Sequence, residues 1–183
     1  LAQSDEMRVE GNRLVTDKGE ITLRGVNVPS LGWGMAEHIY ESAIEMFDSW
    51  NANVIRVAVQ PKYWNNGSIA EKGENSGLSA EKYREYVDNL ISLAASRGKY
   101  ILLDCHTYVM PIQETYDFWT EMAQRYGSNP TVIFGLLNEP HDIKPQKYNE
   151  ETSAWETDSE TSTWEVWRNG GNILKDGSVV RAY

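Results

Sequence analysis

Residues 100–106 read YILLDCH, a run of apolar side chains that ends in an aspartate, a cysteine and a histidine. An apolar run of this length is typical of a strand that is buried on both faces of a parallel sheet. Residues 54–59, VIRVAV, have the same β-branched character, and residues 131–137 form another such run. Because helix-like segments separate these runs, we predict an α/β fold built on a parallel sheet.

The segments between the predicted strands have the apolar spacing of helices, and we place these helices at residues 39–51, 79–97 and 116–126. Ser79 is the expected N-cap of the second helix, and Gly98 is its stop. A first strand is expected at residues 23–28.

The two ends of the chain depart from this alternation. Near the N-terminus, residues 7–10 and 13–16 flank a Gly-Asn turn and predict a β-hairpin that continues through residues 17–19 into 21–23. Residues 141–163 are rich in Glu, Thr and Ser and predict a long polar loop. A short helix at residues 164–169 and the start of another element at 179–181 follow.

Composition narrows the classes of function. The chain has 183 residues, which suits one domain, and its net charge of −10 argues against nucleic acid and against an anionic membrane surface. No apolar run approaches the roughly 20 residues of a membrane span. Seven Trp and ten Tyr suit a surface that meets sugar rings. The single cysteine, Cys105, excludes an intramolecular disulfide and is expected in the core.

Polar residues lie at or near the carboxyl ends of three successive predicted strands. They are Arg56 in the second strand, His106 after the third, and Asn138 with Glu139 after the fourth. In parallel α/β architectures, ligands bind at this edge of the sheet. We therefore expect these four residues to form an active site.

Each of these residues also has a simpler interpretation. Arg56 needs a carboxylate partner inside a sheet, which is either a structural ion pair or a catalytic carboxylate that Arg56 positions. His106 is either a core histidine or a donor to a sugar hydroxyl. Glu139 precedes Pro140, which ends the strand. A carboxyl group that is partly shielded at such a strand end can act as a general acid near neutral pH, although a plain loop start is the alternative.

Taken together, these motifs resemble glycoside hydrolase family 5. The resemblance is carried by residues 24–27, 54–59, 103–106 and 137–140, with further matches at 118–123 and 126–130. It covers about residues 7–141 and again 164–171.

The resemblance implies a (β/α)8 barrel, a secreted bacterial cellulase and hydrolysis with retention of anomeric configuration. Glu139 would be the acid/base, and Asn138 would contact the 2-hydroxyl of the sugar at the cleavage point. Arg56 would support the nucleophile, and His106 would bind the same sugar. Trp33 would contact the substrate, with packing under the first loop as its alternative. The expected substrate is a β-1,4-glucan, with no cofactor and no metal.

We expect residues 1–183 to form a single partial catalytic domain: strands one to four in residues 7–141, then the polar loop and a C-terminal segment in 142–183. Only about four βα units, a half-barrel, are expected, whereas a complete barrel needs about 250 residues. Retention needs a second carboxylate roughly 5 Å from the first, and we find no counterpart of it. Asp104 shares the face of His106 but lies deeper in the strand.

Five acidic residues of the polar loop could reach inward as a substitute for the second carboxylate, but a solvated segment is the expectation. Their spacing lacks the pattern of a calcium loop. These residues are Glu150, Glu151, Glu156, Asp158 and Glu160. Three readings of the chain stay open: a fragment of an endoglucanase, a half-barrel that forms a homodimer through open sheet edges, and a carbohydrate-binding protein without hydrolysis.

Overall fold

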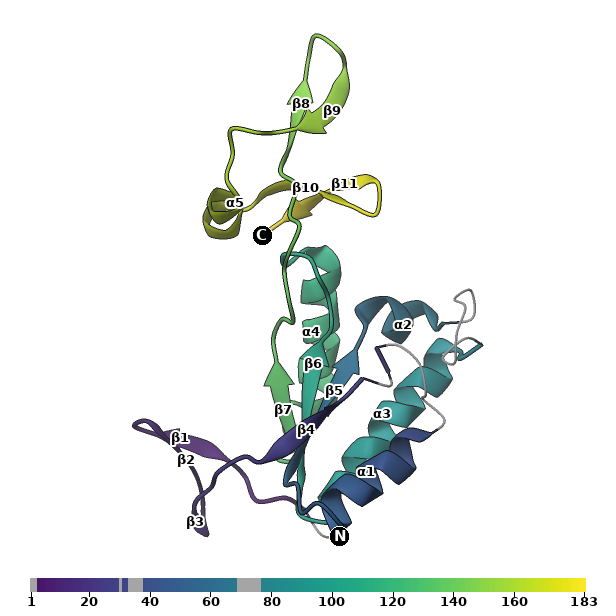
Figure 1. The fold of residues 1–183 in the computed structure, drawn as a ribbon, viewed down its shortest axis with the longest axis vertical. Coiled ribbons are helices and arrows are strands. Elements are labelled where there is room, and N and C mark those ends of the chain that lie inside the picture. Colours follow the sequence, from purple (N-terminus) through teal and green to yellow (C-terminus); the bar gives the residue numbers. More distant parts are fainter. Residues whose placement is uncertain (1–2, 30, 33–37, 69–76) are drawn as a thin grey trace. The chain divides into compact units, whose positions relative to one another are not determined.

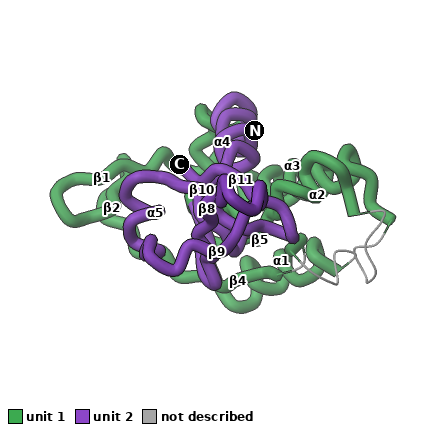
Figure 2. The backbone as a smooth tube through the Cα atoms, turned by 90° about the horizontal axis from the view of Figure 1, so that it is seen from above, with its two compact units in different colours: residues 1–106, 126–136 green, residues 107–125, 137–183 purple. Residues whose placement is uncertain are grey.

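The computed structural model describes residues 3–29, 31–32, 38–68 and 77–183. The chain forms two compact units (Figure 2). Residues 1–106 and 126–136 make the first unit, and residues 107–125 and 137–183 make the second. The chain therefore passes from the first unit to the second after His106 and again after Leu136, close to the ends of two predicted strands.

The first unit is built on a four-stranded sheet in which all neighbouring strands run parallel (Figure 1). In spatial order its strands are β4 (Gly25–Val28), β5 (Val54–Val59), β6 (Tyr100–Cys105) and β7 (Val132–Gly135). The central strands β5 and β6 are buried at every position but one, as their continuous apolar sequences predicted. The predicted α/β class and parallel sheet are confirmed.

Strand β7 is shorter than the run at residues 131–137, because its pairing with β6 ends where Gly135 faces Asp104. The two strands lie close together at this point. A Cβ atom on residue 135 would lie 2.7 Å from Leu102 Cδ2 and 3.3 Å from Leu103 O. A side chain at residue 135 would therefore displace the end of the Leu102 side chain and press on the backbone of β6.

The helices of the first unit pack against this sheet and against each other. They are α1 (Ile39–Asp48), α2 (Pro61–Asn66) and α3 (Ala80–Ala95). The hydroxyl of Ser79 accepts a hydrogen bond from Lys82 N at 3.1 Å, so the predicted cap of α3 is confirmed. Helix α2 was not predicted, since six residues with only two buried side chains give no periodic signal.

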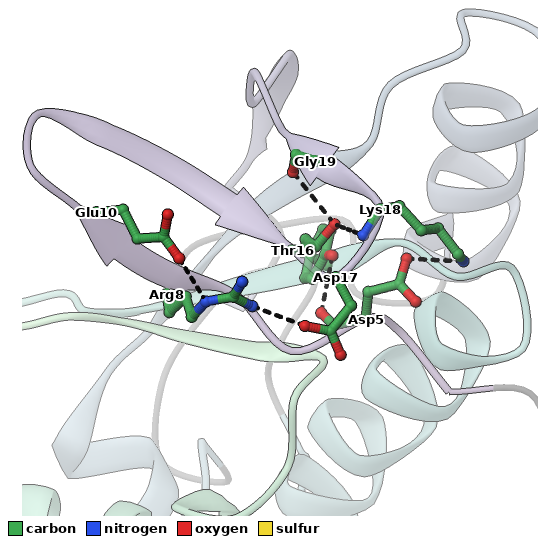
Figure 3. Close-up of polar contacts among 8 residues, drawn as sticks. Asp5, Arg8, Glu10, Thr16, Asp17, Lys18 and Gly19 are labelled. Atoms are coloured by element: carbon green, nitrogen blue, oxygen red, sulfur yellow. Dashed lines mark hydrogen bonds and ion pairs between the residues drawn. The ribbon is translucent and has the colours of Figure 1, made fainter.

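An antiparallel N-terminal sheet precedes β4 and confirms the predicted hairpin. It contains β1 (Arg8–Glu10), β2 (Arg13–Thr16) and β3 (Gly19–Glu20). Figure 3 shows Arg8 between Glu10 and Asp17, at 2.9 and 2.8 Å, and Lys18 against Asp5 at 2.8 Å. The return strand is Gly19–Glu20 and not residues 21–23, because the chain reverses within a tighter turn than expected.

The second unit contains two hairpins and two helices. Its elements are α4 (Gln113–Tyr126, the last residue belonging to the first unit), β8 (Gln146–Asn149), β9 (Ala154–Thr157), α5 (Thr163–Asn169), β10 (Gly171–Lys175) and β11 (Ser178–Ala182). Five residues form its small apolar core: Met110, Ile112, Val166, Ile173 and Ala182. The helix predicted at 164–169 is confirmed as α5.

The long polar loop predicted at residues 141–163 is wrong, because β8 and β9 pair within it as an antiparallel hairpin. All four residues of β9 are exposed, as are two of the four in β8. Strands with so few buried residues show no apolar alternation, so no sequence pattern marks them. Among the described residues, no helix is long and apolar enough to cross a membrane.

Candidate active site

In the first unit, polar side chains of β4, β5 and β6 contact one another. Asn27 and Arg56 are register partners in neighbouring strands. Arg56 Nη1 donates to Asn27 Oδ1 at 3.3 Å, and about a third of the Arg56 side chain is exposed. The guanidinium therefore reaches from β5 to β4 and is partly exposed.

A buried carboxylate joins two of the predicted site residues. Asp104 Oδ2 lies 2.8 Å from Arg56 Nη2 and 2.7 Å from His106 Nδ1. The Asp104 side chain is only 2% exposed. The carboxylate that Arg56 requires inside the sheet is thus Asp104, which supports the structural ion-pair reading. This burial and pairing leave Asp104 unsuited to attack a sugar carbon as a substitute nucleophile.

His106 extends the ladder between the central strands by one residue, since its N–H donates to Val59 O at 2.9 Å. The histidine is buried, and its ring lies close to Gly32. A Cβ atom on residue 32 would lie 3.5 Å from His106 Cδ2 and 3.1 Å from Ala58 Cβ. A side chain at residue 32 would therefore press on Ala58 while only touching the histidine ring.

The segment that carries Gly32 is tied to β5 and α3. Gln60 Nε2 donates to Gly32 O at 2.8 Å, and Tyr83 Oη donates to Leu31 O at 2.6 Å. Tyr83 also accepts from Gln60 N at 3.1 Å. Burial raises the pKa of the Tyr83 phenol far above its ordinary value, so it stays a neutral donor. Trp33, the expected substrate-contacting aromatic, lies outside the described residues.

Asn138 and Glu139 belong to the second unit. Glu139 N donates to Thr107 O at 3.3 Å, and His141 N donates to Tyr108 O at 3.2 Å. The segment after β7 thus pairs with the segment after β6. Asn138 is half-buried in this arrangement.

The expected partial shielding of Glu139 is wrong, because its side chain is exposed. Its neighbours Pro140 and His141 are exposed as well and give it no cover. The site around Glu139 is therefore open to water in this chain.

Two rings beside Glu139 were not singled out from the sequence. Tyr108 and His141 lie edge to face, with ring centroids 5.3 Å apart. His141 Nδ1 also lies 2.8 Å from Asp142 Oδ2. The sequence contains one indication of Tyr108: it lies two residues after His106, just past the end of the predicted strand, where further site residues can be expected.

The acidic residues after Pro140 lie on the β8–β9 hairpin and the turn that follows it. Glu156 accepts from Asn149 Nδ2 at 2.7 Å. The hydroxyl of Thr161 donates to Asp158 and lowers the pKa of that carboxyl. Among the residues that the structure describes, no three His, Cys, Asp or Glu side chains are grouped so that they could hold a metal ion.

The structure thus brings Arg56 and His106 together around Asp104 within one unit, and it describes Asn138 and Glu139 within the other. Polar side chains at the carboxyl ends of parallel strands, with helices between the strands, are the arrangement of parallel α/β enzymes.

Comparisons with known proteins identify the family. The family model for cellulase, glycosyl hydrolase family 5, matches residues 14–172. The chain therefore belongs to glycosyl hydrolase family 5, a family of (β/α)8 barrels.

The chain is 30% identical over 142 residues to endoglucanase A of Butyrivibrio fibrisolvens, with 74% of this chain and 32% of that protein covered. It is 31% identical over 146 residues to endoglucanase N of Pectobacterium atrosepticum, with 74% and 30% covered. Among solved structures, a β-glucanase of Saccharophagus degradans in complex with cellotetraose matches with a TM-score of 0.56 and 26% identity. That match covers 75% of this chain and 43% of the other. The chain spans about a third of the length of these curated relatives.

Proposed function

We propose that the protein hydrolyses β-1,4-glycosidic bonds in a plant cell-wall polysaccharide, as an endo-β-1,4-glucanase. The observation that carries this proposal is the order of polar residues along successive parallel strands: Arg56 lies within β5, His106 follows β6, and Asn138 and Glu139 follow β7. Membership in glycosyl hydrolase family 5 and similarity to endoglucanases support it. The relative that was solved with cellotetraose supports a β-glucan as the substrate.

In the proposed mechanism, Glu139 is the general acid/base of a retaining reaction. A second carboxylate attacks the anomeric carbon, the bond to the leaving oxygen breaks, and Glu139 gives that oxygen its proton. Glu139 then removes a proton from the water that releases the sugar. The exposure of Glu139 leaves its carboxyl accessible to a polymer and to water.

The other residues bind and orient the sugar at the cleavage point. Asn138 contacts its 2-hydroxyl, His106 binds the same sugar, and Trp33 offers an aromatic face. Arg56 supports the nucleophile, in addition to its contact with Asp104. The nucleophile lies outside this sequence, on another strand of the barrel.

The four parallel strands are, in this proposal, the first half of a (β/α)8 barrel, and residues 1–183 are part of one catalytic domain. The enzyme is secreted and bacterial. Its similarity to the endoglucanases of two bacteria, Butyrivibrio fibrisolvens and Pectobacterium atrosepticum, supports this assignment.

The test supplies the missing nucleophile from solution. Azide attacks the anomeric carbon of 4-methylumbelliferyl β-cellobioside, the aryl oxygen leaves with the proton of Glu139, and α-cellobiosyl azide forms. We expect Glu139→Gln to lower this rate by about 100-fold or more. Glu150→Gln is the matched control, since Glu150 is also exposed in the second unit.

Retained activity in Glu139→Gln removes Glu139 from the acid/base role. Hydrolysis without azide that depends on Glu139 shows instead that this chain supplies its own nucleophile. No turnover under either condition contradicts the enzyme proposal.

A second candidate is a carbohydrate-binding half-barrel that associates with itself. It rests on β4 and β7, which are the two edges of the described four-stranded sheet. It predicts calorimetric binding of cellotetraose without products and with no change in Glu139→Gln. Light scattering at micromolar protein concentration would then give a dimer mass, and a monomer mass would contradict self-association.

A further inference from the structure

The buried cluster around Asp104 defines the hydrogen-bonding state of His106. A single oxygen, Oδ2 of Asp104, lies within 2.8 Å of both Arg56 Nη2 and His106 Nδ1. The side chains of Asp104 and His106 are 2% and 4% exposed. Little water therefore competes for either partner.

Arginine constrains the protonation of this cluster. Its guanidinium donates only and keeps its charge in proteins. An ionised aspartate only accepts, and a buried one needs a positive partner, which Arg56 provides. With Asp104 accepting from both sides, the proton of the contact to His106 must come from Nδ1.

We propose that Asp104 is a positioning residue that fixes His106 as the neutral tautomer with its proton on Nδ1. Nε2 then carries a lone pair and accepts hydrogen bonds. A charged imidazole is not needed, because Arg56 already balances the charge of Asp104. Any group that hydrogen-bonds to Nε2 must be the donor.

This assignment reverses the direction expected from the sequence, in which His106 donates to a sugar hydroxyl. The hydroxyl donates to His106 instead. Only this last step depends on the proposed function, while the tautomer follows from the contacts of Asp104 with Arg56 and His106.

The ring edge that carries Nε2 lies beside Gly32. Cδ2, the atom bonded to Nε2, lies beside Gly32, where a Cβ atom would come within 3.5 Å. The hydrogen bond from Gln60 Nε2 to Gly32 O holds this segment. The histidine is thus oriented by Asp104 at Nδ1 and bounded by Gly32 beside Cδ2.

The chain offers a matched control within its own sequence. His141 Nδ1 lies 2.8 Å from Asp142 Oδ2, nearly the same distance, but these side chains are 55% and 87% exposed. Asp142→Asn removes the same type of contact, between a histidine Nδ1 and a carboxylate, at a solvent-exposed position. It leaves the cluster around Asp104 unchanged.

The test is a long-range 1H–15N spectrum of protein labelled with 15N in its imidazole rings, which distinguishes the two tautomers and the charged ring. The sequence has three histidines, so His38→Gln and His141→Gln, both at exposed positions, assign His106 by elimination. We expect the proton of His106 on Nδ1 at neutral pH in the parent protein and in Asp142→Asn. In Asp104→Asn the amide can donate to Nδ1, and we expect the proton to move to Nε2.

A parent spectrum with the proton of His106 on Nε2, or on both nitrogens, overturns the proposal even if Asp104→Asn does not fold. A proton that stays on Nδ1 in folded Asp104→Asn overturns it as well. Titration with cellotetraose tests the sugar contact separately: an unchanged Nε2 resonance argues against His106 as a sugar ligand, while the tautomer is read from the sugar-free spectrum.

Discussion

Two histidine–aspartate pairs in this chain have nearly the same geometry and different surroundings. His106 and Asp104 lie 2.7 Å apart with side chains 4% and 2% exposed, whereas His141 and Asp142 lie 2.8 Å apart with 55% and 87% exposed. In the buried pair the aspartate also forms an ion pair with Arg56. These contacts hold the side chains at the end of β6 in one arrangement. In the exposed pair water can replace either partner. Distance alone therefore does not reveal what a contact contributes.

The largest expected effect is the loss of the buried carboxylate. Asp104→Ala leaves Arg56 without its strand-end partner and should lower the free energy of unfolding by about 3 kcal/mol, the low end for a buried ion pair because Arg56 is partly exposed. Urea unfolding followed by circular dichroism measures this change. A loss below about 1 kcal/mol would mean that the contacts of Asp104 contribute no more to stability than a solvent-exposed ion pair does.

A smaller effect is expected from crowding the segment that lies beside the histidine ring. In Gly32→Ala the new methyl group would lie 3.1 Å from Ala58 Cβ and 3.2 Å from Pro29 O. We expect a cost of about 1–2 kcal/mol and a changed His106 resonance, since the neighbours are backbone and a short side chain. Unchanged stability and an unchanged spectrum would mean that Gly32 does not bound the ring.

The ion pair of Arg97 and Asp48 has two hydrogen bonds but is partly exposed, so it tests how solvent changes the effect of such a contact on the pKa of the carboxyl group. Arg97 donates to both carboxylate oxygens of Asp48, at 2.9 and 3.0 Å, and lowers the pKa of that carboxyl below its ordinary value of 3.8. Because the folded-state pKa is lowered, the contribution to stability is present above the unfolded pKa and is lost as the pH falls through the folded pKa. Arg97→Gln should return the pKa of Asp48 towards its ordinary value in a carboxyl NMR titration. An unchanged pKa would show that Arg97 is not its cause.

The smallest effect is expected at the exposed histidine pair. Asp142→Ala should change the free energy of unfolding by less than about 0.5 kcal/mol, as for other hydrated ion pairs. The same urea experiment measures it. A loss close to that of Asp104→Ala would remove the distinction between the two pairs.

The sequence predicted the first unit well, because buried strands carry continuous apolar runs and α3 carries a serine cap. It also placed Asp104 on the same face as His106, which the structure confirms through their contact. The sequence could not show that Asp104 joins Arg56, since that contact depends on the register between two strands. The exposed hairpin β8–β9 and the exposure of Glu139 were missed because local pattern does not report surroundings.

The central claim of the account is that Glu139 protonates the leaving group of a β-1,4-glucoside. Its most direct test compares the azide-dependent rates of the parent chain and Glu139→Gln on phenyl and on 2,4-dinitrophenyl β-cellobioside. The phenyl group needs a proton to leave, so Glu139→Gln should lose about 100-fold or more on it and little on the dinitrophenyl substrate. An equal loss on both substrates, or no loss on either, would contradict the role of Glu139 as the proton donor.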